Sequence, residues 1–581
     1  MLSGGLTPTL DQLQHWTRII GLAQQTIMER AAALPTGPGT FPMAGTMEKI
    51  AEIQTESSQK GLALWQNLMT DIGNGGAGSS NGQTGGDARP AAGQDRRFRD
   101  PAWSDHPVYS VLRQTYLLAS ESLLRSVDSI EGLDARQKEQ ARFAMQSLID
   151  ATSPTNFPLT NPQVVQRTIE TNGKNLLVGL ERMMADLEQG QLRQTTPDAF
   201  TVGGNIAVTP GKVIHETPYY QLIQYSPTTK SAYETPLVIF PAWINRFYIL
   251  DLSPEKSFVR WAVEQGLTVF MVSWKSADAS LTETVLDDYV GAQVDAIDTV
   301  RGLLDVDSVH VIGYCVAGTT LAATLAWLET QGRQDIVKSA TFLVAQVDFA
   351  DAGDLKVFVD GPLLGLIEQL VTDGYLDGRY LAATFNLLRG NDLIWSYVVN
   401  NYLMADDYAP FDLLFWNSDT TNLPARWLRS YLEDFYRDNR LVQAGSLSVL
   451  GAPIDLRMIK VPTYIQAGVE DHIAPARSVW KLRNHLSGPS RFLLAGSGHI
   501  AGVINPPSTQ KYQYWTCDEP VTTLEEFRRK ATETKGSWWP NWIEWIGAAA
   551  SEKVPAVKAR IPGKGRLPAI EEAPGRYVRA R

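Results

Sequence analysis

Cysteine is scarce in this chain: Cys315 and Cys517 are the only two among 581 residues. Two thiols cannot build a disulfide framework and do not make a metal site by themselves, so we expect a reducing, cytoplasmic location and no metal. No stretch of about 18 apolar residues is present, so we expect no membrane span. The first residues hold no basic segment followed by an apolar core, so we expect no secretory signal.

An excess of positive charge is also missing. The formal net charge is −11, which gives no reason to expect a nucleic-acid partner. Hydrophobic residues make up 44% and charged residues 20%, which is ordinary for a folded protein. The length indicates more than one structural unit, because single cores rarely grow past about 250–300 residues. The 16 tryptophans indicate a large aromatic core or, alternatively, a surface that meets an apolar phase.

The first 200 residues have helical spacing of apolar side chains, for example over 9–33, 45–71 and 107–191. Gly, Ser, Asn and Gln dominate the stretch "DIGNGGAGSSNGQTGG" between two of these regions, which is typical of a flexible linker. We therefore predict three segments: a helical arm (1–70), a flexible Gly/Ser-rich linker (71–96) and a helical N-terminal domain (97–200).

Beyond residue 200, short β-branched runs alternate with helical stretches. Strand, helix, strand in alternation predicts a parallel sheet with helices on both faces over 201–581. One long interval, rich in aromatics and leucine, separates 349 from 462, and such an insertion usually forms a cap over the carboxyl ends of the strands. The predicted strands are 235–240, 267–274, 309–313, 340–349, 462–468 and 491–496, and two of the helices between them are 283–304 and 317–331.

The stretch "VHVIGYCVAGTT" places Cys315 between a strand and a helix. A nucleophile elbow has this form, with a strained residue at a sharp turn and small neighbours on both sides. Gly313 fits the first small position, and Ala317 stands where glycine is usual, with Gly318 next. The helix N-terminus favours a thiolate, and the backbone N–H of Val316 would form half of an oxyanion hole. A buried structural cysteine beside a tight turn is the alternative.

The order of the other groups favours the elbow. In enzymes with this turn, the nucleophile is followed along the chain by an acid and then by a histidine, each in a loop after a strand. Asp471 in "YIQAGVEDHIAP" and His499 in "LLAGSGHIAGV" meet that requirement. We interpret His472 as hydrogen-bonded within its loop, His310 as a core residue and Cys517 as inert. Cys315, Asp471 and His499 are therefore the predicted catalytic triad.

Several long segments carry a resemblance to a known family. "GYCVAG", "GVEDHIAP", "GSGHIAGVINPP", "NDLIWSYVVNNYL" and "GSWWPNWIEW" are similar to signature segments of the single-subunit, class I poly(3-hydroxyalkanoate) synthases. The similarity covers roughly residues 97–581, whereas residues 1–95 match only in being helical. One departure is "PAWIN" at 241–245, where many members have two prolines; it leaves the second oxyanion donor open, with a backbone N–H near Trp243 as our expectation.

The resemblance implies an α/β-hydrolase core with a cap inserted at about 350–440, preceded by a helical N-terminal region. It implies an acyltransferase that polymerises (R)-3-hydroxyacyl-CoA, of which 3-hydroxybutyryl-CoA is the expected example. Cys315 would carry the acyl group, His499 would be the base and Asp471 its partner. No cofactor is implied, since coenzyme A is a leaving group. The implied partners are a second copy of the chain, as a homodimer, and the surface of a cytoplasmic polyester granule.

Cysteine suits this chemistry, because transfer from one thioester to another leaves the acyl group activated for attack by a hydroxyl. Serine would form a lower-energy oxygen ester. A thioesterase or an intracellular polyester depolymerase with the same triad remains the alternative enzyme, and a granule-coating protein without activity is a third possibility. The accepted monomer length, the dimer surface, the state of the cap and the role of residues 1–95 stay open at this point.

Overall fold

The computed structural model describes residues 43–73, 95–196, 198–359, 361–371 and 373–580. The chain forms two compact units. The first comprises the described residues up to Gln194 together with Ala383–Ala409, and the second comprises Thr195–Ala382 together with Pro410–Arg581. The helix predicted over 9–33 and most of the predicted linker lie outside the described residues.

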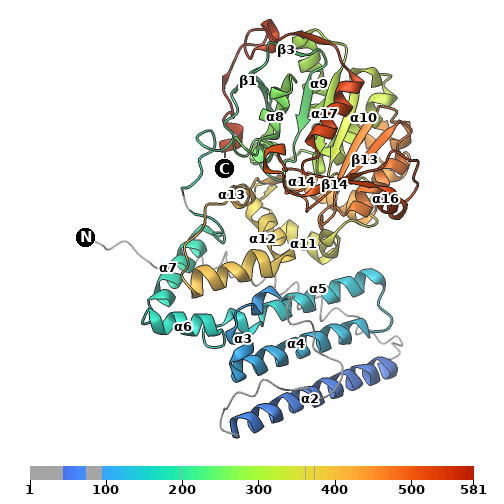
Figure 1. The fold of residues 1–581 in the computed structure, drawn as a ribbon. Coiled ribbons are helices and arrows are strands. Elements are labelled where there is room, and N and C mark those ends of the chain that lie inside the picture. Colours follow the sequence, from blue (N-terminus) through green and yellow to red (C-terminus); the bar gives the residue numbers. More distant parts are fainter. Residues whose placement is uncertain (1–42, 74–94, 197, 360, 372, 581) are drawn as a thin grey trace. The chain divides into compact units, whose positions relative to one another are not determined.

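The first unit is helical (Figure 1). Two of its helices begin at clear sequence signals. The side chain of Asp134 accepts from the N–H of Gln137 at 2.8 Å while the Gln137 side chain accepts from the N–H of Asp134, which is a capping box. Asn161 caps the next helix, whose first residue is a proline with no N–H to satisfy. The helices are α2 (Met43–Gly73), α3 (Ala102–Asp105), α4 (Pro107–Asp128), α5 (Ala135–Ala151), α6 (Pro162–Glu170) and α7 (Lys174–Gln189).

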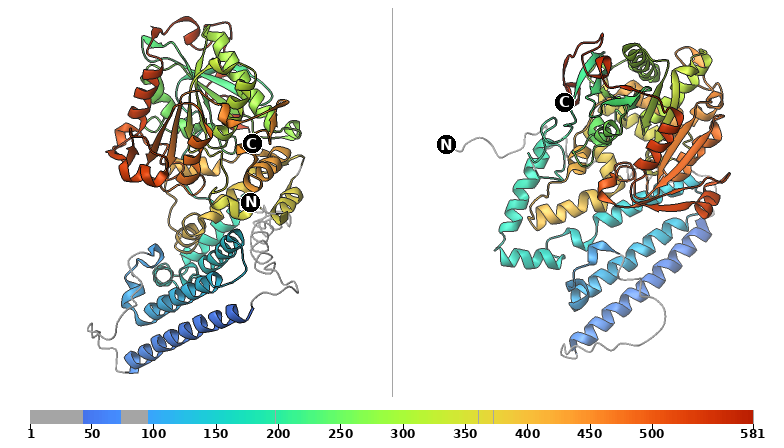
Figure 2. Two further views of the ribbon diagram at one scale, coloured as in Figure 1. Left: turned by 90° about the vertical axis from the view of Figure 1, so that its right-hand side faces the viewer. Right: turned by 45° about the horizontal axis from the view of Figure 1, so that its top comes forward.

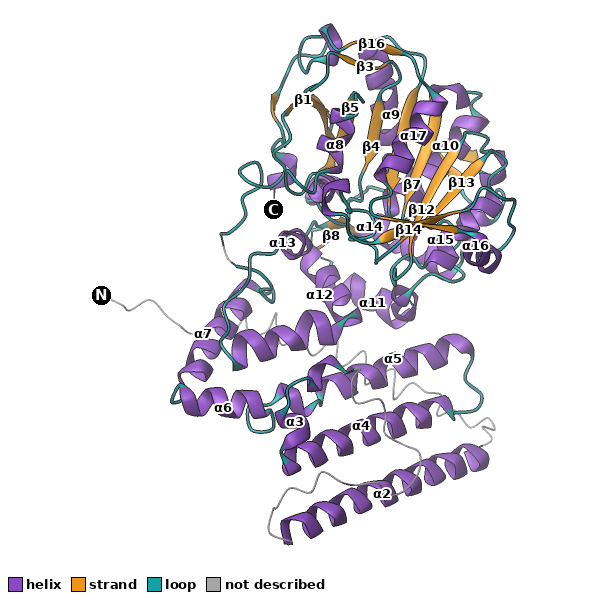
Figure 3. Cartoon of the chain, viewed as in Figure 1, coloured by secondary structure: helices purple, strands orange, loops and turns teal. Residues whose placement is uncertain are grey.

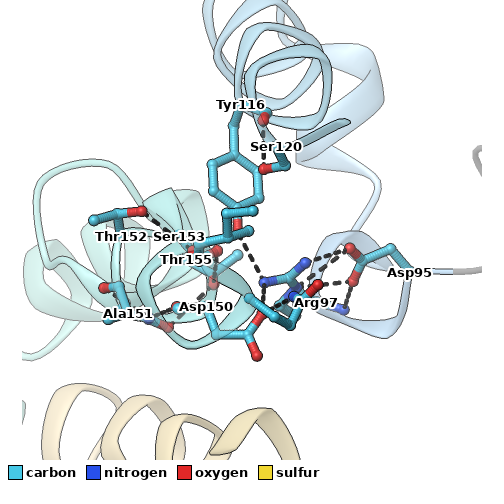
Figure 4. A network of polar contacts seen from close by, with 12 residues as sticks. Asp95, Arg97, Tyr116, Ser120, Asp150, Ala151, Thr152, Ser153 and Thr155 are labelled. Atoms are coloured by element: carbon cyan, nitrogen blue, oxygen red, sulfur yellow. Dashed lines mark hydrogen bonds and ion pairs between the residues drawn. The ribbon is translucent and has the colours of Figure 1, made fainter. Parts of the chain in front are cut away.

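A polar network joins the segment before α3 to α4 and to the end of α5 (Figure 4). The guanidinium of Arg97 pairs with Asp95 at 2.8 Å and donates to the hydroxyl of Tyr116 at 2.9 Å. Its contact with Asp150 is longer, at 3.4 Å. The Tyr116 hydroxyl donates in turn to the carbonyl of Ile149 at 2.8 Å. Because these groups are partly buried, their mutual pairing offsets the cost of removing them from water.

Part of the predicted cap insertion packs in the first unit. From Ala383 on, α12 (Gly378–Leu388) belongs to this unit, and two π-helical stretches follow it, η7 (Asn391–Trp395) and η8 (Val398–Leu403). The Nδ2 atom of Asn175 on α7 donates to the carbonyl of Leu403 at 2.7 Å. The hydroxyl of Tyr402 donates to the buried carboxylate of Asp186 at 2.6 Å. These contacts tie η8 to α7.

The second unit contains an 11-stranded sheet in the order β15-β14-β13-β12-β7-β6-β4-β5-β2-β1-β17. The six strands from β13 to β5 in that order are parallel, as the alternation of strands and helices predicts. Their bounds are β4 (Leu237–Phe240), β5 (Val269–Trp274), β6 (Val309–Tyr314), β7 (Val337–Leu343), β12 (Thr463–Gly468) and β13 (Ser490–Ala495).

The prediction of a wholly parallel sheet was wrong at the two edges. Five antiparallel strands extend the sheet there, and the sequence analysis did not find them. The strand predicted over 340–349 also ends earlier, since Val344 has a φ of 42° and leaves the extended region. The edge strands are β1 (Gly211–Glu216), β2 (Tyr220–Tyr225), β14 (Gln513–Thr516), β15 (Thr532–Lys535) and β17 (Glu571–Glu572).

Helices flank the sheet on both sides (Figures 2 and 3). Phe258 on α8 packs against Trp539 on α17, with ring centroids 5.2 Å apart, whereas α9 and α10 contact each other. Helix α10 is almost entirely buried, which fits its run of Ala, Thr and Leu. The helices of this unit are α8 (Phe258–Glu264), α9 (Leu286–Leu304), α10 (Val316–Thr330), α11 (Gly361–Leu370), α13 (Asp412–Ser418), α14 (Ala425–Ser430), α15 (Ala476–Lys481), α16 (Leu524–Lys530) and α17 (Trp539–Ala549).

The C-terminal tail is held at two places. Strand β17 pairs with β1, and the buried guanidinium of Arg246 donates to the carbonyl of Ala580 at 2.7 Å. Arg246 also pairs with the buried carboxylate of Asp419 at 3.3 Å, so one side chain joins the loop after β4 to the cap segment and the tail.

Among the described residues, every helix falls short of the length and apolarity that crossing a membrane requires.

Candidate active site

Cys315 lies at the turn between β6 and α10 with φ 53° and ψ −126°. A positive φ is strained for a residue with a side chain, at a cost of about 1–3 kcal/mol, and such strain clusters at functional sites. The turn is tight because Gly313 and Gly318 touch: a Cβ on Gly313 would come within 2.5 Å of the Cα of Gly318. The G-x-S-x-G pattern predicts the second small position at Ala317, whereas the residue that packs against Gly313 is Gly318.

Asp471 and His499 lie at the same edge of the sheet as Cys315. They follow β12 and β13, which are parallel neighbours, so their carboxyl ends meet. The Nδ1 atom of His499 is 2.7 Å from Oδ2 of Asp471. The other carboxylate oxygen accepts from the backbone N–H groups of Ile473 and Ala474, each at 2.9 Å. These two bonds fix the carboxylate so that one oxygen faces the imidazole.

His499 also interacts with Cys315. Burial lowers the pKa of His499, but the charges of Asp471 and Cys315 and hydrogen bonds to both side chains outweigh it and raise the pKa to about 10. The structure therefore brings the three predicted triad residues together. With Nδ1 directed at the carboxylate, Nε2 is the ring atom left for the thiol.

The two residues predicted to bind an oxyanion are both near the elbow. Val316 is the first residue of α10, where a helical N–H has no partner within the helix. Trp243 lies in the loop after β4, and β4 pairs with β6 in a register that sets Phe240 against Gly313. Its indole stacks on Tyr289 at 3.8 Å and its carbonyl accepts from the hydroxyl of Thr421 at 2.7 Å. The assignment of Val316 and Trp243 as oxyanion donors stays a prediction.

Aromatic residues that the sequence analysis did not single out border the nucleophile. Tyr431 and Tyr436 lie on a π-helical stretch, η9 (Tyr431–Arg437), that follows α14. Burial raises the pKa of both phenols, and the charges of neighbouring groups, Cys315 among them, raise it further. Phe349 packs on Tyr436 at 4.8 Å and Trp427 stacks on Tyr431 at 5.0 Å. Aromatic side chains packed in this way exclude water. These residues could not be predicted from the sequence, because a π-helical stretch has no recognisable sequence pattern.

The other histidines and the second cysteine that the sequence raised have contacts of their own. His310 is buried in β6, where Nδ1 is 2.7 Å from the hydroxyl of Ser339 and burial lowers the pKa to about 4. Cys517 is half-buried, and its thiol lies 3.7 Å from the carbonyl of Glu519. The carbonyl of His472 accepts from the N–H of Asp354 at 3.0 Å. In the part of the chain that the structure describes, no group of three or more His, Cys, Asp or Glu side chains is arranged to hold a metal ion.

Two family models match the chain. Residues 94–262 match the N-terminus of poly-beta-hydroxybutyrate polymerase (PhaC), and residues 235–506 match the alpha/beta hydrolase fold. The second match covers β4 to the histidine loop and therefore includes all three residues of the predicted triad. The α/β-hydrolase fold expected from the sequence is thus confirmed.

Several curated proteins are similar over most of their length. Poly(3-hydroxyalkanoate) polymerase subunit PhaC of Rhizobium meliloti is 45% identical over 84% of this chain and 80% of its own. Poly(3-hydroxyalkanoate) polymerase of Methylorubrum extorquens is 43% identical over 92% of this chain and 87% of its own. The PhaC subunit of Cupriavidus necator is 42% identical over 94% and 91%. With an elbow cysteine beside a carboxylate-bound histidine in a matching fold, this chain belongs to the poly(3-hydroxyalkanoate) polymerase family.

Proposed function

We propose that Cys315 is the nucleophile of a poly(3-hydroxyalkanoate) polymerase reaction, with His499 as its base and Asp471 as the group that orients the imidazole. As a member of the family, the chain is an acyltransferase that builds poly(3-hydroxyalkanoate). The observation that carries the residue assignment is the hydrogen bond between Asp471 and His499, at the same edge of the sheet as a cysteine in a strained elbow. The substrate we propose is (R)-3-hydroxyacyl-CoA, in particular 3-hydroxybutyryl-CoA.

In the first step, the thiol proton passes to Nε2 of His499, whose pKa the charges of Asp471 and Cys315 raise, and the sulfur of Cys315 attacks the thioester carbonyl. Backbone N–H groups, for which Val316 and Trp243 are our candidates, stabilise the negative oxygen that forms. The bond from the carbonyl carbon to the sulfur of coenzyme A then breaks, and the departing thiolate receives the proton. One thioester replaces another, so the free energy changes little.

In the second step, the hydroxyl at the end of a growing chain attacks the enzyme thioester. His499 takes the hydroxyl proton, an oxygen ester forms, and the proton returns to the sulfur of Cys315. An oxygen ester is more stable than a thioester, so this step is downhill. The wall of Tyr431, Tyr436 and Phe349 supports the proposal, because water in the site would hydrolyse the acyl-enzyme. Neither step calls for a metal or a cofactor, and coenzyme A only leaves.

We further propose that the protein is cytoplasmic, acts as a homodimer and sits on the surface of its polyester granule. The granule proposal is supported by large apolar side chains exposed on the first unit: Leu159 is 86% exposed, Ile169 72% and Leu177 66%. Such a surface meets an apolar phase more favourably than water. The homodimer rests on the family resemblance, and the cytoplasmic location rests on the resemblance and on the scarcity of cysteine.

The test is an assay of purified protein with 3-hydroxybutyryl-CoA that follows both coenzyme A and the acyl product. We expect insoluble polyester, with coenzyme A released in step. Free 3-hydroxybutyrate as the main product would instead indicate a thioesterase. Cys315→Ala should abolish the release of coenzyme A, and unchanged release by this variant would refute the assignment of the nucleophile.

A further inference from the structure

The loop that carries His499 is held by two tryptophans from a distant part of the chain. Gly502 and Val503 are buried in the irregular segment that follows His499. The indole Nε1 of Trp538 donates to the carbonyl of Gly502 at 2.9 Å, and that of Trp539 donates to the carbonyl of Val503 at 3.0 Å. Buried carbonyls outside helices and sheets need such donors, because water cannot reach them.

The two tryptophans are themselves fixed. Both are at most 1% exposed, and Trp539 is the first residue of α17. Phe258 on α8 packs against both rings, with centroids 6.1 Å from Trp538 and 5.2 Å from Trp539. The side-chain amide of Asn505, at the end of the histidine loop, donates to the carbonyl of Gly536, just before the pair. Three residues of the histidine loop, Gly502, Val503 and Asn505, are therefore bonded to the start of α17 or to the residues just before it.

The same helix contacts the strand that leads to Asp471. The hydroxyl of Tyr464 on β12 donates to the side-chain oxygen of Asn541 on α17 at 2.9 Å, and its ring lies 6.3 Å from that of Trp538. One rigid element thus contacts both the loop of His499 and the strand before Asp471. This matters because the imidazole must stay within hydrogen-bond reach of a carboxylate and a thiol from two other segments.

The geometry points to Trp538 and Trp539 as positioning residues, whose N–H groups hold the His499 loop in register with Asp471 and Cys315. This inference rests on the proposed role of His499 as the base. The tryptophans act through the two loop carbonyls and not on the substrate. Each carbonyl accepts one further bond, that of Gly502 from Nε2 of Gln466 at 3.5 Å and that of Val503 from the N–H of Asn505 at 3.1 Å. Loss of an indole N–H removes the shorter bond of each pair, so the loop is held less firmly and shifts. A misplacement of about 1 Å at a catalytic group can lower the rate by about 100-fold.

The same helix offers a matched control. Trp542 is also fully buried and also donates from its indole, but to the hydroxyl of Thr341 on β7 at 3.0 Å. Trp538→Phe, Trp539→Phe and Trp542→Phe each remove one buried indole N–H from one aromatic cluster. Only the first two remove it from the histidine loop. Replacing each tryptophan by benzothienylalanine removes the N–H and keeps the ring shape, so the comparison survives if a phenylalanine variant does not fold.

Two rates distinguish positioning from general packing. The first is coenzyme A release from 3-hydroxybutyryl-CoA. The second is alkylation of Cys315 by iodoacetamide, followed peptide by peptide so that Cys517 does not interfere. Near pH 7, alkylation depends on proton transfer from the thiol to His499, whereas at high pH hydroxide can remove the thiol proton in place of the imidazole. We expect the Trp538 and Trp539 variants to lose about 10-fold or more in both rates near pH 7 and to recover alkylation at high pH.

The Trp542 variant should keep both rates. Equal losses in all three variants, or unchanged rates in the Trp538 and Trp539 variants, would overturn the inference. His499→Gln, measured alongside, separates this failure from failure of the proposed function. If His499→Gln slows both rates and the tryptophan variants do not, the positioning role is wrong. If His499→Gln leaves both rates unchanged, the assignment of the base is wrong.

Discussion

His499 and Asp471 form a short contact between two buried side chains, with Nδ1 of the imidazole 2.7 Å from Oδ2 of the carboxylate. The carboxylate is held on its other side by two backbone N–H groups, so it cannot turn away without losing both bonds. The ring is thereby oriented with Nε2 toward the elbow. Most of what we expect of this enzyme follows from that orientation.

Asp471→Asn tests the orientation directly. The amide oxygen can still accept from Ile473 and Ala474, which leaves an NH₂ group facing the imidazole. Nδ1 must then accept, the proton moves to Nε2, and the ring can no longer take the thiol proton. We expect coenzyme A release to fall by about 10²–10⁴-fold, with the thermal unfolding temperature little changed. A variant that keeps more than a tenth of the wild-type rate would show that the carboxylate does not set the tautomer.

The raised pKa of His499 predicts how the free energy of unfolding depends on pH. Its pKa rises from the ordinary value of 6.5 to about 10 on folding, so the native state keeps a proton that the unfolded chain has lost between those values. Stability from this group is therefore fully present below about pH 6.5 and is lost as the pH rises to about 10. Urea unfolding of wild type and His499→Gln across this range is the measurement. The wild type should lose stability more steeply with pH, and parallel curves would contradict the raised pKa.

Gly318→Ala tests the packing of the elbow. An added Cβ would collide with the side chain of Ala345 and lie 2.7 Å from the carbonyl oxygen of Gly313. Overpacking of this kind costs about 1–3 kcal/mol in the free energy of unfolding, and the strained turn should relax with loss of coenzyme A release. Gly291→Ala is the control, since an added Cβ there has no neighbour within 4 Å and α9 should be stabilised by up to about 1 kcal/mol. Equal effects of the two substitutions would show that the elbow does not depend on Gly318.

The apolar face of α7 tests the proposed granule contact. Leu177 and Leu180 are 66% and 50% exposed and lie three residues apart, so they share one side of the helix. Leu177→Lys with Leu180→Lys keeps good helix formers at both positions, so the helix should persist. We expect less protein to sediment with polyester granules, with the rate of coenzyme A release from soluble substrate unchanged. Glu181→Lys adds positive charge without removing an apolar group, so this variant should sediment with granules as the wild type does. If it sediments as poorly as the double variant, the added charge, and not the loss of apolar side chains, explains the effect.

The central strands and the order of the three candidate catalytic residues could be predicted from the sequence. Buried parallel strands read as continuous apolar runs, and Cys315, Asp471 and His499 each follow one. Strand β15 could not, because its short exposed sequence "TETK" has no apolar face to mark it. The contact between Trp538 and the histidine loop was equally hidden. It joins segments 36 residues apart through a backbone carbonyl, which leaves no pattern in the side chains.

Both proposed steps require that the sulfur of Cys315 carries the acyl group. The most direct measurement is rapid quenching of the protein with 3-hydroxybutyryl-CoA, followed by mass spectrometry of the peptide that contains Cys315. We predict a hydroxybutyryl adduct, or a short oligomer of it, on Cys315 and on no other residue, and no adduct in Cys315→Ala. Polyester formation with Cys315 unmodified at every time point, or an equal adduct in the alanine variant, would contradict the account.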